Sequence, residues 1–285
     1  MMNSRIVRNF RPGQFLQLAA AHAALLLYTA IALFPVFLVI INSLKDRRAI
    51  FSTPYALPNA ENFNPIGYET VFQRAQFPNY FMNSLTVTIV SLVLIFFAGT
   101  MAAYALSEYK FRGNAFLGLY LSLGIMIPIR LGTVSILRLI VSLKLADTLT
   151  GLILVYTAMG LPLAIFVLSQ FMRDIPRDLK DAARVDGASE YRIYWMILPL
   201  IRPALGTVLV FNMIPIWNDL WFPLIMAPSE QNKTVTLGAQ AFLGQYVNDW
   251  NAVLASLSLA AIPVVILYII FSRQLIRGLT SGAVK

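Results

Sequence analysis

The chain alternates long apolar runs with short polar segments. Four runs carry no charged residue, and they cover about 15–41, 84–106, 148–172 and 252–272. A bilayer core is about 30 Å thick and needs roughly 20 helical residues at about 1.5 Å of rise each. We therefore predict a membrane-spanning helix at each of these four positions.

Two further apolar segments are interrupted by a charged residue. The segment 116–137 contains Arg130 shortly after Pro128, and the segment 203–227 contains Asp219. If each one crosses the membrane, six spans result and both termini lie on the same side. The expected fold is a single all-α membrane domain over 1–285, with an external cap loop at 44–80 and an inner loop at 173–202.

Basic residues outside the spans predict the orientation. With both termini in the cytoplasm, 14 Lys and Arg residues lie on the inner side and 8 on the outer side, as the positive-inside rule favours. Arginines precede the first run, as they do in a signal peptide, but the apolar region of a signal peptide has only about 7–15 residues. The run at 15–41 is longer, so we predict an uncleaved membrane anchor.

The composition supports a lipid environment and limits the chemistry. Only 12% of the residues are charged and the mean hydropathy is +0.70, whereas a soluble protein is about 25% charged. The net charge of +9 fits loops that flank membrane helices, so no nucleic-acid partner is needed. Cysteine is absent and there is one histidine. The chain lacks a GxxxxGK[ST] phosphate loop and a nucleophile–base motif, so we expect no catalytic residue, no metal site and no cofactor bound by this chain.

The inner loop 173–202 holds 11 charged residues, nearly a third of the total. Pro176 suits the first turn of a helix, Asp186-Gly187 suits its end, and Ser189 suits the cap of a second helix. The pattern predicts a helix-turn-helix at the cytoplasmic face. Physical chemistry alone leaves two interpretations open, a docking surface for another protein and an amphipathic linker resting on lipid headgroups.

This loop resembles the EAA signature of ABC importer permeases. The matching residues are Asp181-Ala182-Ala183, Asp186-Gly187-Ala188 and Ile197-Leu198-Pro199, and the departure is Asp181, where the family usually has Glu. Further segments resemble the maltose-type carbohydrate-uptake subgroup, namely Tyr80–Leu85, Ala102–Leu106, Phe111-Arg112-Gly113, Trp217-Asn218-Asp219 and the tail 277–285.

The resemblance implies a six-span permease of the type I ABC importer fold in a bacterial inner membrane. It would import a di- or oligosaccharide or a sugar derivative by alternating access. The implied partners are a second permease, two ATPase subunits that use ATP and Mg²⁺, an external sugar-binding protein and membrane lipid. The residues implied in coupling to the ATPase are Asp181, Ala182, Ala183, Asp186, Gly187, Ala188 and Pro199, with Gly278, Gly282 and Lys285 in the tail.

Candidate residues for the substrate path are those that interrupt the apolar spans with polar or aromatic groups. An ionisable residue inside a span is expensive and suggests function, and indole, amide and carboxylate groups suit sugars. The alternatives are that the tryptophans form an interfacial belt, and that Arg130 reaches the headgroups or pairs with Asp219. The candidates are Trp217, Asn218, Asp219, Trp221 and Arg130.

Two other classes of protein remain as alternatives to a permease driven by a partner ATPase, namely an ion-coupled transporter and a membrane-embedded enzyme. An ion-coupled secondary transporter of a small polar solute would use Asp219 and Arg130, and an inverted internal repeat would support it. The sequence has no convincing repeat of this kind. A membrane-embedded enzyme is disfavoured because the chain lacks a nucleophile motif and a metal-ligand cluster.

Overall fold

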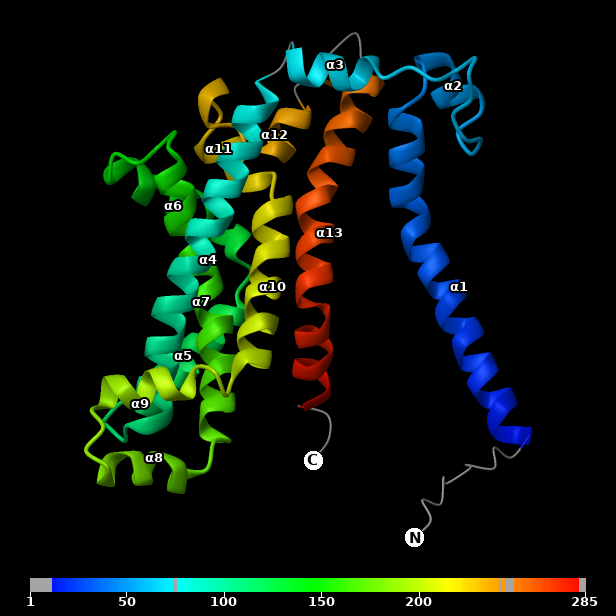
Figure 1. The fold of residues 1–285 in the computed structure, drawn as a ribbon. Helices are drawn as coiled ribbons and strands as arrows, with labels where there is room; N and C mark the ends of the chain where they lie inside the picture. The colour runs from blue at the N-terminus through cyan, green and yellow to red at the C-terminus, as the bar shows by residue number, and fades with distance from the viewer. Residues whose placement is uncertain (1–11, 74–75, 241, 244–248, 282–285) are drawn as a thin grey trace.

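The computed structural model describes residues 12–73, 76–240, 242–243 and 249–281. Within these ranges the chain forms helices and turns, without a β-strand. Lys45 and Phe63 form an isolated antiparallel β-bridge. The long helices run between two ends of an elongated molecule (Figure 1). We call these the cap end, where α2 (Arg47–Ser52) and α3 (Ile66–Gln73) lie, and the loop end, where α8 (Arg177–Val185) and α9 (Glu190–Ile197) lie.

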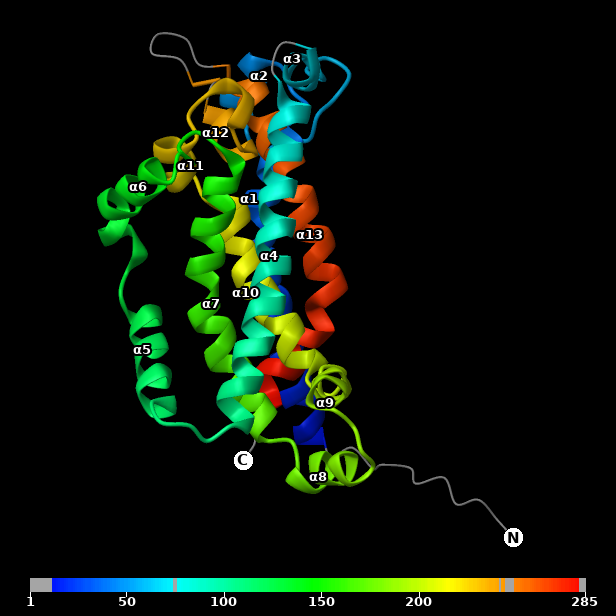
Figure 2. The same cartoon turned by 90° about the vertical axis from the view of Figure 1, so that its left-hand side faces the viewer.

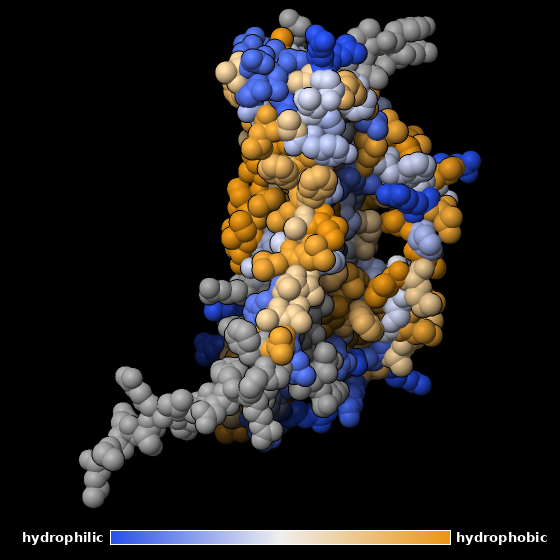
Figure 3. All heavy atoms as spheres, turned by 90° about the vertical axis from the view of Figure 1, so that its right-hand side faces the viewer, coloured by the Kyte–Doolittle hydropathy of each residue, from blue (hydrophilic) through white to orange (hydrophobic). Residues whose placement is uncertain are grey.

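Four long helices contain the four uninterrupted apolar runs. They are α1 (Pro12–Ser43), α4 (Phe77–Glu108), α7 (Leu149–Arg173) and α13 (Trp250–Ser281). Each is long and apolar enough to cross a membrane, and the count rises to as many as six if each of two bent helix pairs forms one span. Hydrophilic side chains gather at both ends and hydrophobic ones between them (Figure 3). The four spans predicted from the runs are confirmed as helices.

The segment 116–137 is not one straight helix. Its first part, α5 (Asn114–Met126), ends before Pro128, and η1 (Ile129–Gly132) and α6 (Thr133–Ser142) follow after a bend of 90°. Ile127 has extended backbone, with φ −81° and ψ 120°, because the proline ring disfavours the helical region for the residue before it. The interruption predicted near Pro128 and Arg130 is therefore a sharp bend between two helices, and the segment counts as one membrane span only if the bent pair crosses together.

The segment 203–227 is also broken. The helix α10 (Arg202–Asn218) ends one residue before Asp219, whose backbone is extended at φ −72° and ψ 133°, and a short helix α11 (Trp221–Met226) follows. The Asp219 carboxylate accepts hydrogen bonds from the backbone N–H groups of Trp221 and Phe222 at 3.2 and 3.1 Å. It therefore satisfies two orphan donors at the start of α11.

The cap end is held together by a buried lysine. Lys45 is fully buried, and its Nζ donates to Asn42 Oδ1 at 3.1 Å and to the carbonyl of Thr53 at 2.9 Å. Burial lowers the pKa of Lys45 because desolvation disfavours the charged form. Asn251 donates to the Lys45 carbonyl at 2.6 Å. These bonds join α1, the predicted cap loop and α13. The predicted loop is slightly too long, because its last residues, 77–80, form the first turn of α4.

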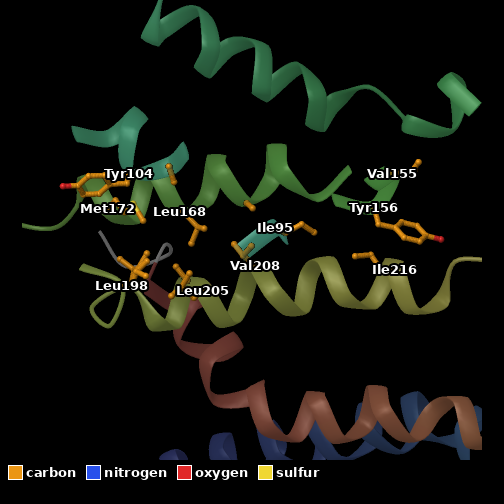
Figure 4. Packing of buried hydrophobic residues seen from close by; sticks show 14 of the residues in the cluster. Ile95, Tyr104, Val155, Tyr156, Leu168, Met172, Leu198, Leu205, Val208 and Ile216 are labelled. Carbon is orange, nitrogen blue, oxygen red and sulfur yellow. The ribbon is translucent and has the colours of Figure 1, made fainter. Parts of the chain in front are cut away.

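The apolar core lies where α4, α7 and α10 meet (Figure 4). Ile95 of α4, Leu168 of α7 and Val208 of α10 are at most 3% exposed. Gly160 of α7 allows a close helix crossing, since an added Cβ would lie 3.1 Å from Asn212 Cγ on α10. Close packing of this kind, with small residues at the contact, is typical of membrane helices.

Two helices stand apart from this core. Over its apolar window, α1 is 6% buried, and it diverges from α13 towards the loop end (Figure 1). The helix α5 has no buried residue and lies at the edge of the bundle beside α7 (Figure 2). Lipid or other chains must cover these apolar surfaces, because their exposure to water would be energetically unfavourable.

The glycine at the helix crossing gives a stability test. We expect Gly160→Ala to destabilise the protein by about 1–3 kcal/mol, as overpacking does, and to lower the thermal midpoint of the purified protein. Gly118→Ala on α5 is the matched control, since an added Cβ meets nothing within 4 Å there and alanine favours the helix. Equal midpoints for the two variants would contradict the packing described here.

Candidate functional site

The segment 173–202 folds as the two short helices predicted from its sequence. Gly187 lies just past the end of α8 with φ +74°, a conformation that suits glycine. Its N–H donates to the Arg184 carbonyl at 3.0 Å, and the Ala188 N–H donates to the Ala183 carbonyl at 2.9 Å. These two bonds form a Schellman motif. Ser189 then caps α9 by accepting a hydrogen bond from the Arg192 N–H at 3.4 Å.

One face of this segment is open. The helix α8 lies farther from the bundle than α9 does (Figures 1 and 2), and Val185 at its end is 88% exposed. Ala183 and Ala188 are half-buried against the apolar core. The remaining residues implied in coupling are exposed, and they are Asp181, Ala182, Asp186, Gly187 and Pro199.

A buried ion pair fixes α8 to the end of α4. Lys180 and Glu108 form this pair, and their side chains are only 4% and 9% exposed. Lys180 Nζ also donates to the Met172 carbonyl of α7 at 3.0 Å. Arg184 Nη2 lies 3.5 Å from Glu108 Oε2. One carboxylate of α4 therefore meets two cations of α8.

Glu190 extends this network to α9. It accepts from Arg184 Nε at 3.0 Å, from the Tyr104 hydroxyl at 2.6 Å and from the Tyr109 hydroxyl at 3.2 Å. Its hydrogen bond with Arg184 is the main cause that lowers the pKa of Glu190, and burial raises the pKa of Tyr109. A lowered pKa means that the charged Glu190 stabilises the fold at neutral pH, and that this contribution is lost as the pH falls through the lowered value.

Sequence reasoning missed this network. Glu108, Lys180 and Glu190 were not among the candidates. One signal was present, since Lys180 and Arg184 are four residues apart and therefore share a face of α8. That pattern calls for an acidic partner, but it does not identify Glu108, 72 residues earlier in the chain.

At the cap end, Asp219 lies among donors that occupy both of its carboxylate oxygens. Oδ2 accepts from the Tyr156 hydroxyl at 2.9 Å and from the Phe222 N–H, while Oδ1 accepts from the Trp221 N–H and lies 3.6 Å from Arg130 Nη2. The side chain is 9% exposed. Asp219 thus caps α11 and pairs with Arg130, which is one of the alternatives that the sequence left open.

Arg130 and Trp221 form the exposed part of this cluster. The Arg130 side chain is 67% exposed, and its Cζ lies 5.9 Å from the centre of the Trp221 ring, within the range of a cation–π contact. Trp221 Nε1 donates to Thr133 Oγ1 at 3.0 Å. The structure thus brings together three of the five residues predicted for the substrate path.

The other two candidates lie elsewhere. Trp217 is 2% exposed, donates from Nε1 to the Ala260 carbonyl at 3.0 Å, and packs edge-on against Phe81. It lines a wholly apolar cavity of about 540 Å³ between α4, α10 and α13, and such a lining does not suit sugar hydroxyls. Asn218 is exposed and donates back to the Ile214 carbonyl at 3.0 Å.

The tail candidates lie at the limit of the described chain. Gly278 is within α13, whereas Gly282 and Lys285 lie outside the described residues. Among the described residues, no group of three or more His, Cys, Asp or Glu could hold a metal ion.

These features define a helical membrane protein with a two-helix segment fixed to its core at one end. The sequence profile of the family described as "Binding-protein-dependent transport system inner membrane component" matches residues 95–281. The chain belongs to this family.

Relatives and solved structures agree with this assignment. The chain is 30% identical to the diacetylchitobiose uptake system permease protein NgcG of Streptomyces coelicolor, over 94% of this chain and 89% of that one. It is 31% identical to the arabinooligosaccharides transport system permease protein AraQ of Bacillus subtilis, over 89% and 90%. The predicted resemblance to carbohydrate-uptake ABC permeases is confirmed.

One solved structure shares the fold. It belongs to a bacterial ABC transporter involved in the import of the acidic polysaccharide alginate, and it matches with a TM-score of 0.78 and 20% identity, over 93% of this chain and 98% of that one. The fold is therefore that of an ABC transporter permease.

The buried ion pair predicts a double-mutant effect. Lys180→Met leaves Glu108 buried without its closest cation, so we expect a loss of about 3–5 kcal/mol and a clear fall in thermal midpoint. The double variant Lys180→Met/Glu108→Gln removes both charges and is expected to recover part of this loss. A double variant no more stable than the single one would contradict the pairing.

The Asp219 cluster predicts unequal effects for its two charges. Asp219→Ala removes the cap of α11 and the Tyr156 bond, so we expect a loss of about 1–3 kcal/mol. Arg130→Gln removes an exposed partner worth about 0–1 kcal/mol. Thermal midpoints of the purified variants measure this difference, and an equal or reversed order would count against a structural role for Asp219.

Proposed function

We propose that this chain is the permease subunit of an ATP-driven, binding-protein-dependent sugar importer of a bacterial inner membrane. It forms half of the translocation pathway and does no covalent chemistry itself. The observation that carries this proposal is the identity of 30–31% with two permeases named for oligosaccharide uptake, over about nine tenths of the chain. The proposed substrate is accordingly a di- or oligosaccharide or a sugar derivative.

The proposed topology has six spans with both termini in the cytoplasm. The four long helices provide four spans, and the broken segments α5–α6 and α10–α11 provide the other two. The excess of basic residues on the loop-end side supports this orientation. The cap end then faces the external sugar-binding protein, and the loop end faces two ATPase subunits that use ATP and Mg²⁺.

The proposed coupling element is the segment 173–202. Its exposed face, with Ala182, Asp186 and Gly187, lets another surface approach closely. The Glu108–Lys180 pair transmits movement of that face to α4, so closure of the ATPases changes the arrangement of the spans by alternating access. The tail residues Gly278, Gly282 and Lys285 are proposed to add to this contact.

The proposed sugar contacts are Arg130, Trp221 and Asn218, which are exposed. An indole face suits a sugar ring, and a guanidinium or amide group suits its hydroxyls. Asp219 supports this surface from within by capping α11, whereas Trp217 attaches the end of α10 to α13. The second permease subunit supplies the opposite wall of the pathway and covers apolar surface of this chain.

A bulky residue on the docking face tests this function. We expect Gly187→Arg in the assembled transporter to reduce sugar uptake and binding-protein-stimulated ATP hydrolysis by at least about tenfold, as loss of a well-packed contact of about 1.4 kcal/mol or more would. Membrane insertion is expected to persist. The measurements are uptake into vesicles and ATPase rate.

The matched control is Gly113→Arg. Gly113 also has positive φ, at +98°, and an added Cβ also meets nothing within 4 Å there, so the control also places an arginine at a positive-φ position, but outside the segment 173–202. Wild-type rates for Gly187→Arg would overturn the coupling role. Uptake that persists without ATP but stops when the proton gradient is removed would instead identify an ion-coupled secondary transporter.

A further inference from the structure

A polar cavity at the loop end has an unbalanced positive charge. Its volume is about 870 Å³, and it lies between the end of α4, the start of α5, the end of α7 and α8. Two of its cations, Lys180 and Arg184, are paired with acids. The other three form no ion pair with any residue in the described part of the chain, and they are Lys110, Arg173 and Arg177.

A groove continues from this cavity towards the middle of the molecule, with a mixed polar and apolar lining near the cavity and a mainly apolar lining farther along. A second cavity of about 210 Å³ between α5 and α7 shares Leu106, Asn114 and Arg173 with the first. A third of about 320 Å³ follows farther along the same two helices, with Gly124 and Pro162 in its wall. Figure 3 shows an opening beside the arm that α5 and α6 form.

The groove is long enough to hold the part of an acyl chain that lies within one bilayer leaflet. Its lining residues on α7 recur at steps of one and three, from Arg173 through Phe166 to Ala158, so they form one face of the helix. Fifteen residues at about 1.5 Å of rise span roughly 22 Å. A single leaflet has a hydrocarbon depth of about 15 Å, half of the bilayer core.

We propose that this groove binds an anionic phospholipid, with its phosphate in the polar cavity and one acyl chain along the surface groove that α5 and α7 line together. Lys and Arg bind phosphate oxygens through charge-assisted hydrogen bonds, and basic pockets beside membrane helices attract anionic headgroups. A free phosphate ester would meet the same cations but would leave the apolar part of the groove uncovered. The groove therefore favours the lipid as the source of the phosphate.

The lipid would act as a support for α5. This helix has no buried residue, and Gly118 at its inner face has open space around it, which leaves room for an acyl chain. The headgroup would meanwhile contact α7 and α8 through Arg173 and Arg177. This role goes beyond sugar transport and does not depend on which solute the protein carries.

The test is lipid binding to the purified, assembled transporter, measured by native mass spectrometry. Phosphatidylglycerol and phosphatidylcholine with the same acyl chains are titrated against wild type and three variants. Lys110→Gln/Arg177→Gln removes two unpaired cations of the cavity. Arg192→Gln/Arg202→Gln removes the same charge from the same end, outside the cavity. Gly118→Leu fills the groove and leaves the cations in place.

Wild type is expected to bind phosphatidylglycerol more tightly than phosphatidylcholine. Each basic residue near the membrane surface contributes about fivefold to anionic lipid binding, so Lys110→Gln/Arg177→Gln is expected to weaken phosphatidylglycerol binding roughly thirtyfold. The Arg192→Gln/Arg202→Gln control is expected to keep the wild-type affinity. Gly118→Leu is expected to weaken the binding of both lipids.

Three results would overturn the proposal. Equal affinity of the wild type for the two lipids would show that the cations of the cavity do not select the anionic headgroup. Displacement of phosphatidylglycerol by inorganic phosphate, together with no effect of Gly118→Leu, would identify a site for free phosphate. Loss of the ATPase subunits from Lys110→Gln/Arg177→Gln, with lipid binding unchanged, would identify the cavity as a protein-docking surface.

Discussion

The buried ion pair between Glu108 and Lys180 is the constraint on which the loop end depends. Two charges that are less than a tenth exposed are tolerated because they pair with each other and because the Met172 carbonyl accepts a further hydrogen bond from the ammonium. The pair holds α8 against the end of a helix that runs through the whole core. Any force on α8 therefore acts on α4 and α7 together, and the short two-helix segment behaves as part of the bundle instead of as a loose linker.

The two charges that interrupt apolar segments show how position decides the role of an ionisable group. Asp219 has both oxygens occupied by Tyr156, by two backbone N–H groups and by Arg130, so it shapes the chain where α10 ends. Arg130 keeps two thirds of its side chain exposed and lies over the Trp221 ring. An ionisable residue in a span is costly wherever it lies, but only the exposed member of this pair is free to meet a solute.

Local features of the sequence predicted much of this architecture. Uncharged runs marked the four long helices, and Pro176, Gly187 and Ser189 marked the ends of α8 and α9, because caps and breaks depend on neighbouring residues alone. The same rules could have predicted the bend at Pro128, because a proline disfavours helix at the residue before it. The apolar residues that continue after Pro128 made the segment look like one span. The pairing of Arg130 with Asp219 was among the alternatives stated from the sequence. Lys180 as the partner of Glu108 and Tyr156 as the partner of Asp219 were out of reach, since they lie 72 and 63 residues away in the chain, and only packing brings them together.

The bond from Asn251 to the Lys45 carbonyl joins positions 206 residues apart. During synthesis α1 enters the membrane long before α13 exists, and for that time it has no neighbour at the place where the cap will close. Only 6% of its apolar window is buried against the rest of the protein, and a helix that is apolar all round is stable in lipid without a protein neighbour. The bonds of Lys45 Nζ to Asn42 and Thr53 span only 3 and 8 residues, whereas the bond of the Lys45 carbonyl to Asn251 can form only after α13 has been made. The first part of the cap can therefore form early, and its connection to α13 is a late step of assembly.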